Sequence, residues 1–424
     1  MTEAFLQYLW QHKLLDGNLT TTDGLPLVVE SPGEKNLDAG PDFFNARLRI
    51  GDVQWAGNVE VHVRASEWNQ HGHSADMAYN NVILHVVYIH DCDVTLSGGK
   101  KVATVAVADA VPDQVWQNYV RLQEPPDGTI ACADRLSEIP DFLIGVNKER
   151  MLVERMERKS GQVKSLLKET KGNWEETCYR LTAHYFGSKI NDVPFDLLTK
   201  VTPLSVAAKF RDNAFRVEAL YMGQAGFLDT DFDDDYPRAL QREYDYLQMA
   251  YKLKPLEKYL WKFFRLRPSS FPTIRISQFA GLISKTRNLF SKLLEADGVE
   301  ALRSLYEVSA SDYWNTHYTF DTPAQECPKS LGKGFVDVLI VNAWAPLLFQ
   351  YGVEHGEDAF KQKAFDLLRK LPPENNRIVR LWRAAGVEAK HAADTQALLQ
   401  SYNVYCRPKR CLDCQLAFRI LKLK

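Results

Sequence analysis

Residues 53–64 read VQWAGNVEVHVR, and this stretch decides the fold of the first part of the chain. Apolar residues take the odd positions and mostly polar residues the even ones, which is the period of two of a half-buried β-strand. On such a strand the side chains of Glu60, His62 and Arg64 point to one face. The segment therefore presents an acid, an imidazole and a guanidinium side by side.

The preceding residues predict the strand's partner. Residues 46–50 alternate in the same way and lead into the turn dipeptide Gly51-Asp52, so the two segments form an antiparallel hairpin. A two-residue turn pairs residues whose numbers sum to 103, namely Ile50 with Val53, Leu48 with Trp55, and Phe44 with Val59. This register matches the apolar faces of the two strands.

More strands follow, and then the pattern changes to helices. Residues 82–88 are an apolar, β-branched run that predicts a central strand, and residues 97–100 predict a second hairpin that joins 94–96 to 102–107. Helices are expected at residues 1–10, 141–171, 174–186, 214–224, 241–253, 277–296, 334–351, 359–371 and 392–403. The fold class is α+β: a mixed sheet in a domain of residues 1–125, a linker at 126–140, and a helical region over 141–424.

Composition restricts the class of protein. The chain has 424 residues, 52 basic against 54 acidic, and 45% hydrophobic residues, which is typical of a soluble globular protein and excludes disorder and collagen. The longest apolar run, residues 335–353, contains Asp337 and Pro346, so we expect a buried helix and no membrane segment. No charged signal region precedes the first apolar stretch, and seven cysteines are sparse, so a reducing, cytoplasmic location is expected.

Histidines and acids gather in the sheet domain. Five of the ten histidines fall within 29 residues: His62, His71, His73, His85 and His90, beside Glu60, Glu67 and Asp76. Carboxylate oxygens bind hard divalent ions, and a neutral imidazole can bind a metal or accept a proton near pH 7. The cluster predicts divalent-metal chemistry.

Two short motifs, Gly40-Pro41-Asp42-Phe43 and Gly57–His62, resemble the core of the PD-(D/E)XK nuclease superfamily. The resemblance implies that Asp42 and Glu60 hold Mg²⁺ or Mn²⁺ for hydrolysis of DNA phosphodiesters. His62 stands where the family usually has a lysine, so His62 or His71 would orient the attacking water. Residues 71–79 resemble the histidine segment of repair-type members, which gives His73, Asp76 and His85 supporting roles.

The predicted register conflicts with this assignment. Without an irregularity Asp42 lies opposite Val61, on the apolar side of the hairpin and away from Glu60. A bulge or strand break between Asp42 and Phe44 is required. In the alternative interpretation Glu60, His62 and Arg64 form a solvated face, Asp42 caps a turn, and His85 is a core histidine with its hydrogen bonds satisfied.

A wider likeness covers most of the chain. The runs at residues 40–46, 59–63 and 79–87, with Glu374-Asn375-Asn376 and Tyr405-Cys406 further on, resemble an uncharacterised bacterial domain-of-unknown-function family, DUF2851-like. That resemblance implies no activity.

The C-terminal tail carries a second metal motif. Cys406-x4-Cys411-x2-Cys414 places three thiols in nine residues, and a fourth ligand would complete a Zn²⁺ or iron–sulfur site. Cys327 is the remote candidate and His391 a weaker one. The alternative is a set of thiols without metal.

Two stretches carry an excess of basic residues. Residues 252–275 hold seven basic residues against one acid, interleaved with aromatics, and the tail from residue 405 repeats the bias. Cations contact phosphates and aromatic rings stack on bases, so both stretches predict nucleic-acid contact, unless they are solvated faces over buried rings. The candidate contacts are Lys258, Lys262, Arg265, Arg267, Lys409 and Arg410.

Together these features favour a metal-dependent nuclease acting on DNA. The competing hypothesis is a non-catalytic nucleic-acid or protein-binding module on a decayed nuclease scaffold. A third is a metalloenzyme for other substrates that uses its histidines as Zn²⁺ or Fe²⁺ ligands. No phosphate loop or dinucleotide motif is present, so no nucleotide or dinucleotide cofactor is expected.

Overall fold

The computed structural model describes residues 1–126 and 128–423, so Asp127 of the predicted linker and Lys424 lie outside the described part. The chain divides into two compact units. Unit 1 holds residues 1–147, 384–387 and the tail from residue 401, and unit 2 holds residues 148–383 and 388–400. The tail, which the sequence grouped with the helical region, joins the sheet in unit 1.

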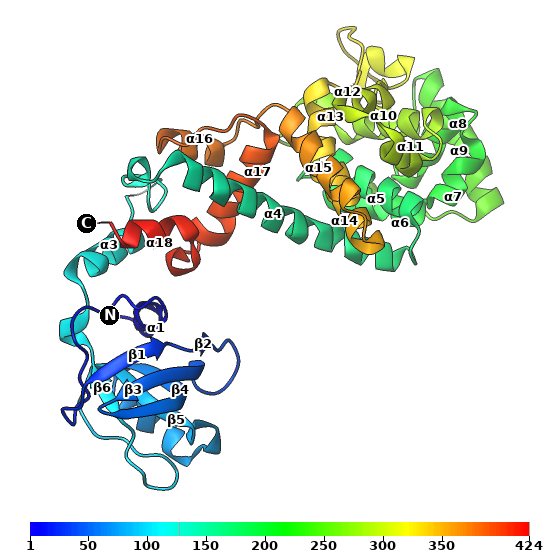
Figure 1. Ribbon diagram of the computed structural model, residues 1–424. Coiled ribbons are helices and arrows are strands. Elements are labelled where there is room, and N and C mark those ends of the chain that lie inside the picture. Colours follow the sequence, from blue (N-terminus) through cyan, green and yellow to red (C-terminus); the bar gives the residue numbers. More distant parts are fainter. Residues whose placement is uncertain (127, 424) are drawn as a thin grey trace. The chain divides into compact units, whose positions relative to one another are not determined.

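The α+β class and the mixed sheet of the N-terminal region are confirmed (Figure 1). Within the described residues the large sheet runs β1-β3-β4-β5-β6, with β2 paired to β3. β3 is antiparallel to its three partners, and β4, β5 and β6 run parallel. The strands are β1 (Leu27–Ser31), β2 (Glu34–Lys35), β3 (Phe43–Ile50), β4 (Val53–Arg64), β5 (Val82–Ile89) and β6 (Thr104–Ala106).

β4 has the predicted bounds, and β5 is central, as predicted, between β4 and β6. The second predicted hairpin is present in a shorter form, without two full strands. Thr95 pairs antiparallel with Lys101, the Leu96 amide donates to the Lys100 carbonyl, and the Val102 amide donates to the Val94 carbonyl. The segment beyond it, β6, pairs with β5 instead. Val94 and Val102 are also buried against Trp68 and Tyr79, which holds the hairpin against the helical segment.

The hairpin of β3 and β4 contains a bulge. Ile50 pairs with Val53 and Leu48 with Trp55, as predicted, but Phe43 rather than Phe44 faces Val59. The register shifts between Phe43 and Ala46, where Asn45 adopts a left-handed φ of 58°, a conformation that asparagine tolerates better than most residues. The bulge that the site requires is thus present, slightly further along the strand than expected.

Helices flank the sheet and hold the tail in unit 1. The helices are α1 (Glu3–Gln11), α2 (Glu67–Gln70), α3 (Asp113–Gln123) and α18 (Gln415–Leu421). The Thr2 side chain caps α1 by accepting a hydrogen bond from the Phe5 amide. The buried Asn118 side chain of α3 donates to the Ile420 and Leu423 carbonyls, which fixes α18 against α3.

Unit 2 is helical apart from the small hairpin of β7 (His317–Thr319) and β8 (Thr322–Pro323). Two helices have the predicted bounds, 174–186 and 214–224, whereas the predicted helix at 277–296 breaks in two near Asn288, which has a left-handed φ of 52°. The longer helices are α4 (Asp141–Glu169, which begins in unit 1), α5 (Trp174–Phe186), α6 (Asp192–Val201), α8 (Ala214–Gln224), α9 (Asp235–Tyr251), α10 (Pro272–Lys285), α14 (Ala345–His355), α15 (Asp358–Lys370) and α17 (Ala392–Gln400). The shorter ones are α7 (Leu204–Ala207), α11 (Leu289–Glu295), α12 (Gly298–Leu305), α13 (Lys333–Leu339) and α16 (Arg377–Ala384).

The apolar run of the sequence forms one continuous helical segment, Lys333–His355, which has a π-helical turn at residues 340–344. Among the described residues it is the one helix long and apolar enough to cross a membrane, and 72% of its most apolar window is buried. That share is typical of a core helix in a soluble protein.

Candidate functional site

The bulge in β3 brings two predicted ligands together. The Asp42 amide donates to Glu60 Oε2 (3.1 Å), and the Val61 amide donates to Asp42 Oδ2 (3.0 Å). A further bond to Asp42 Oδ1 comes from Gln7 Nε2 of α1 (2.8 Å). The register conflict is therefore resolved in favour of adjacent carboxyl groups.

Two histidines lie near the other oxygen of Glu60, and a third lies beside them. His62 Nε2 lies 3.5 Å and His73 Nε2 3.3 Å from Glu60 Oε1, and His62 Nε2 lies 3.2 Å from His71 Nδ1. The ligand atoms of the three histidines all lie within 4.8 Å of one another. Three imidazoles thus come together, with Glu60 beside two of them, from β4 and from the segment that follows α2.

Contacts with other buried residues fix the orientations of the His62 and His73 rings. His62 Nδ1 forms a hydrogen bond of 2.9 Å with His85 Nε2, from β5. The His73 ring stacks on Tyr79 with centroids 3.8 Å apart and meets the edge of the buried Trp68. His73 Nε2 is buried and has no hydrogen-bond partner among the described residues. Buried polar atoms nearly always have a partner, so this nitrogen is a candidate metal ligand.

Burial is the first cause of the pKa shifts at this site. Burial and then the nearby Asp42 charge raise the pKa of Glu60 to about 8. Burial, followed by the other histidines, lowers the pKa of His62 to about 3, and the pKa of His73 is lowered for the same reasons. His62 and His73 are therefore neutral nitrogen donors at neutral pH, while Glu60 holds a proton when no metal is bound.

The interpretation of Glu60 and His62 as a solvated face is wrong, because these side chains are only 5% and 1% exposed. The segment after β4 covers them, so both faces of β4 are buried at this point. His85 is fully buried, and its Nδ1 atom has no partner among the described residues, so its hydrogen bonds are not all satisfied. Asp76 is exposed and accepts from the Ala78 amide, which shapes the loop that carries His73.

Residues that the sequence did not single out complete the site. Gln7 also donates to Glu3 Oε1 (3.0 Å), so α1 contributes an amide and an acid next to Asp42. Burial and the Asp42 charge raise the pKa of Glu3, while the Lys35 charge acts in the opposite direction on both acids. The spacing of Glu3 and Gln7 on one face of a first helix was a possible signal, but nothing local connected that helix to Asp42.

The cysteines of the tail acquire a different partner from the expected one. Cys327 lies exposed in unit 2, with its thiol near the Pro328 carbonyl. In unit 1, Cys132 interacts electrostatically with Cys406, Cys411 and Cys414. Cys132 lies within the predicted linker, where no spacing marked it as a ligand.

The basic residues occupy two separate surfaces. In unit 2, Lys258, Lys262, Arg265 and Arg267 lie on an irregular loop whose Tyr259 and Phe264 rings are 72% and 81% exposed. Trp261 of the same loop is buried and donates to the Ala225 carbonyl. The loop therefore presents both cations and exposed rings, and the Arg265 guanidinium lies over the Phe264 ring at 5.3 Å from its centroid.

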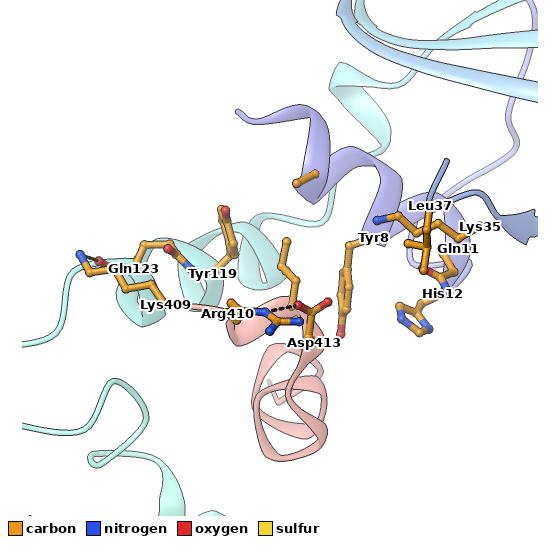
Figure 2. A pocket seen from close by; sticks show the side chains of 12 residues that line it. Tyr8, Gln11, His12, Lys35, Leu37, Tyr119, Gln123, Lys409, Arg410 and Asp413 are labelled. Carbon is orange, nitrogen blue, oxygen red and sulfur yellow. Dashed lines mark hydrogen bonds and ion pairs between the residues drawn. The ribbon is translucent and has the colours of Figure 1, made fainter. Parts of the chain in front are cut away.

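In unit 1, Lys409 and Arg410 line a cavity of about 690 Å³ (Figure 2). Lys35 and His12 come from the opposite wall, near α1, and Tyr119 comes from α3. Lys409 Nζ donates to the Gln123 carbonyl, and Arg410 pairs with Asp413 at 2.9 Å. The cavity has more basic than acidic groups on its wall and opens beside the helix that supports Asp42.

Comparison with known proteins places the chain in a family. The DUF2851 family, described as a protein of unknown function, matches residues 3–377. The chain belongs to the DUF2851 family. No curated protein and no solved structure matches the chain. The matched region contains Asp42, Glu60 and the histidine site, and it ends before the cysteine tail.

Proposed function

We propose that this DUF2851 chain is a divalent-metal-dependent hydrolase that cleaves phosphodiester bonds of nucleic acid, with DNA as its substrate. The observation that carries the proposal is the group of His62, His71 and His73, whose ligand atoms all lie within 4.8 Å of one another. Glu60 Oε1 lies 3.5 Å from His62 Nε2 and 3.3 Å from His73 Nε2. The bulge that sets Asp42 beside Glu60 supports the resemblance to the PD-(D/E)XK core.

The spacing fits a bound ion. A tetrahedral site with metal–ligand bonds of about 2.0–2.1 Å separates its ligand atoms by roughly 3.3–3.4 Å. The distances from His62 to His71 (3.2 Å) and from Glu60 to His62 (3.5 Å) and His73 (3.3 Å) are close to this value. Three imidazoles favour a transition ion over Mg²⁺. Mn²⁺ is the ion used in the tests below, because it also accepts the carboxylate of Glu60. When bound, a divalent ion supplies Lewis-acid polarisation of a phosphate oxygen.

The neighbouring residues have supporting roles in this proposal. Both carboxylate oxygens of Asp42 already accept hydrogen bonds from the protein, and the Asp42 amide donates to Glu60. In this proposal Asp42 therefore orients Glu60. His85 holds the second nitrogen of His62, as outer groups do for metal-binding histidines. His71 is the exposed member of the set, so the substrate reaches the site past its ring.

Surface chemistry supports a nucleic-acid substrate. The loop with Lys258 and Lys262 combines cations with the exposed rings of Tyr259 and Phe264, which suits phosphate contact and base stacking. In unit 1 the cavity with Lys409 and Arg410 offers cations beside α1. We place the activity in the cytoplasm, because Cys132, Cys406 and Cys411 are free thiols, as in reducing compartments.

A cleavage assay tests the proposal. Purified protein is incubated with DNA and Mn²⁺, and the parent is compared with Glu60→Gln, His73→Ala and the control His90→Ala. His90 belongs to the same run of histidines, but its Nε2 pairs with Asp93 away from the site. We expect the first two variants to lose cleavage by at least 100-fold and the control to retain it. Equal cleavage by the parent and Glu60→Gln would refute the site.

The second candidate is a binding module without catalysis, and His62 in the usual lysine position favours it. This alternative predicts that the parent binds DNA with a strong salt dependence but never cleaves it, with or without Mn²⁺. Activity on small phosphoesters but not on DNA would instead indicate a metalloenzyme for other substrates.

A further inference from the structure

The C-terminal tail is fixed to residues 116–135 by hydrogen bonds that the proposed nuclease site does not use. Asn118 donates to the Ile420 and Leu423 carbonyls, and its Oδ1 atom accepts from Arg135 Nη1 (3.1 Å). Lys409 Nζ donates to the Gln123 carbonyl (2.7 Å), and the Cys411 thiol lies 3.8 Å from the Leu122 carbonyl. These contacts bring the tail cysteines against the segment that contains Cys132.

Four thiols meet there from two parts of the chain. Cys132 and Cys411 are buried, at 6% and 5% exposure, and Cys406 and Cys414 are half-buried. Cys132 interacts electrostatically with each of the three tail thiols, and the tail thiols interact with one another. Four of the seven cysteines thus share one site.

A cluster of thiols without metal is a poor explanation for this arrangement. A buried cysteine normally acts as a small apolar side chain, and nothing in that role requires four of them to converge. Cys132, Cys406 and Cys411 remain free thiols despite the crowding. The thiolate form of cysteine binds metal, and a bound metal displaces the thiol proton and stabilises the thiolate.

The sulfur spacing distinguishes between metals. One zinc ion with Zn–S bonds of about 2.3 Å holds its sulfurs roughly 3.8 Å apart. Within the described part of the chain, the three histidines are the one group whose ligand atoms all lie within 4.8 Å of one another, so no three of these sulfurs are that close. A wider set suits a cluster in which each sulfur binds a different iron.

We propose that Cys132, Cys406, Cys411 and Cys414 bind an iron–sulfur cluster that fixes the C-terminal tail to α3. The ligands would be one cysteine from the segment after α3 and three from the tail. Cys327 has no part in this site, and the proposal does not depend on the activity of the histidine site.

The test is metal analysis of full-length protein purified without oxygen. We compare the parent with Cys132→Ser and with the matched control Cys327→Ser, which changes an exposed thiol in unit 2. We expect iron, acid-labile sulfide and a broad visible absorbance in the parent and in Cys327→Ser, and at least a tenfold loss of all three in Cys132→Ser. Zinc in place of iron, no metal in the parent, or loss only in Cys327→Ser would each overturn the proposal.

A second measurement on the parent alone covers the case in which Cys132→Ser does not fold. Alkylation with iodoacetamide, read by peptide mass spectrometry, should modify Cys327 and leave the four cluster cysteines unmodified. After oxidation and chelation of iron, we expect all four to react together. Alkylation of Cys406 and Cys414 in the untreated parent at the rate of Cys327 would contradict a cluster.

Discussion

Binding of Mn²⁺ to the histidine site is expected to release one proton near pH 7, and that proton comes from Glu60. Burial and the charge of Asp42 raise the pKa of Glu60 to about 8 in the metal-free protein. A carboxyl group must lose its proton to bind a metal ion. His62 and His73 have lowered pKa values and are already neutral at this pH, so they release none.

The expected magnitude follows from the position of that pKa. Below pH 8 the metal competes with a proton for Glu60, so the apparent affinity falls about tenfold for each pH unit while one proton is displaced. Above pH 8 Glu60 is ionised before the metal arrives, and the affinity becomes independent of this group. The affinity curve therefore rises with pH and levels off near pH 8.

Isothermal titration calorimetry of Mn²⁺ binding at pH 7, in two buffers of different ionisation enthalpy, measures the number of protons released. The matched variant is Glu60→Gln, which resembles the protonated acid in shape and should fold normally because Glu60 is protonated in the metal-free protein at pH 7. We expect about one proton from the parent, none from this group in the variant, and weaker binding by the variant.

Two results would refute the reasoning. Binding without proton release by the parent would mean that Glu60 is already ionised or is not a ligand. Equal proton release by the parent and Glu60→Gln would assign the proton to another group, and the proposed ligand set would have to change.

Two further predictions concern unit 2. A Cβ atom at Gly223 of α8 would lie 2.0 Å from the Tyr244 ring of α9. We therefore expect Gly223→Ala to destabilise the protein by about 1–3 kcal/mol, measured as a lower Tm. The control is Gly161→Ala, whose added Cβ has no atom within 4 Å and should be neutral or stabilising. Burial lowers the pKa of His184, but the hydrogen bond to Asp196 and the charges of Asp196 and Asp192 together outweigh this and leave the pKa raised. The pair therefore contributes stability below about pH 6.5, the usual histidine pKa, and this contribution is lost as the pH rises through the raised pKa. In urea melts, His184→Gln should destabilise the protein by under about 1 kcal/mol at pH 5.5 and leave its stability unchanged at pH 9. Equal loss of stability at both pH values would contradict the assignment.

The sequence predicts β4 and β5 well because burial on a pleated strand leaves a pattern that is visible within a few residues. The bulge at Asn45 leaves no such pattern, because its position depends on which residues pair across the two strands and not on the residues next to it. The requirement for it came from the conflict between the hairpin register and the placement of Asp42. Its position could be located only once the pairing of Phe43 with Val59 was known.

The candidate site was predicted in its residue types but not in its internal arrangement. Glu60, His62, His71 and His73 come together as expected from their closeness in sequence, because a short segment after β4 folds back over the strand. Gln7 and Cys132 were missed, since each meets its partners across 35 or more residues and has no neighbouring residue of the same kind to mark it. Long-range partners of isolated residues leave no local signal.

The first helix connects the two proposed metal sites. Gln7 of α1 donates to Asp42, and Tyr8 on the adjoining face is close enough to Cys414 that, after burial, the thiolate charge raises the pKa of Tyr8. Helix α1 therefore links the tail to Asp42. If the cluster stabilises the position of α1, its loss should weaken Mn²⁺ binding, because Asp42 orients Glu60. Asp42 also raises the pKa of Glu60, so the proton release at pH 7 should fall as well, but burial is the first cause of that raised pKa and part of the release should remain. Partial proton release thus indicates damage to the support of the site, whereas Glu60→Gln removes the contribution of Glu60 completely.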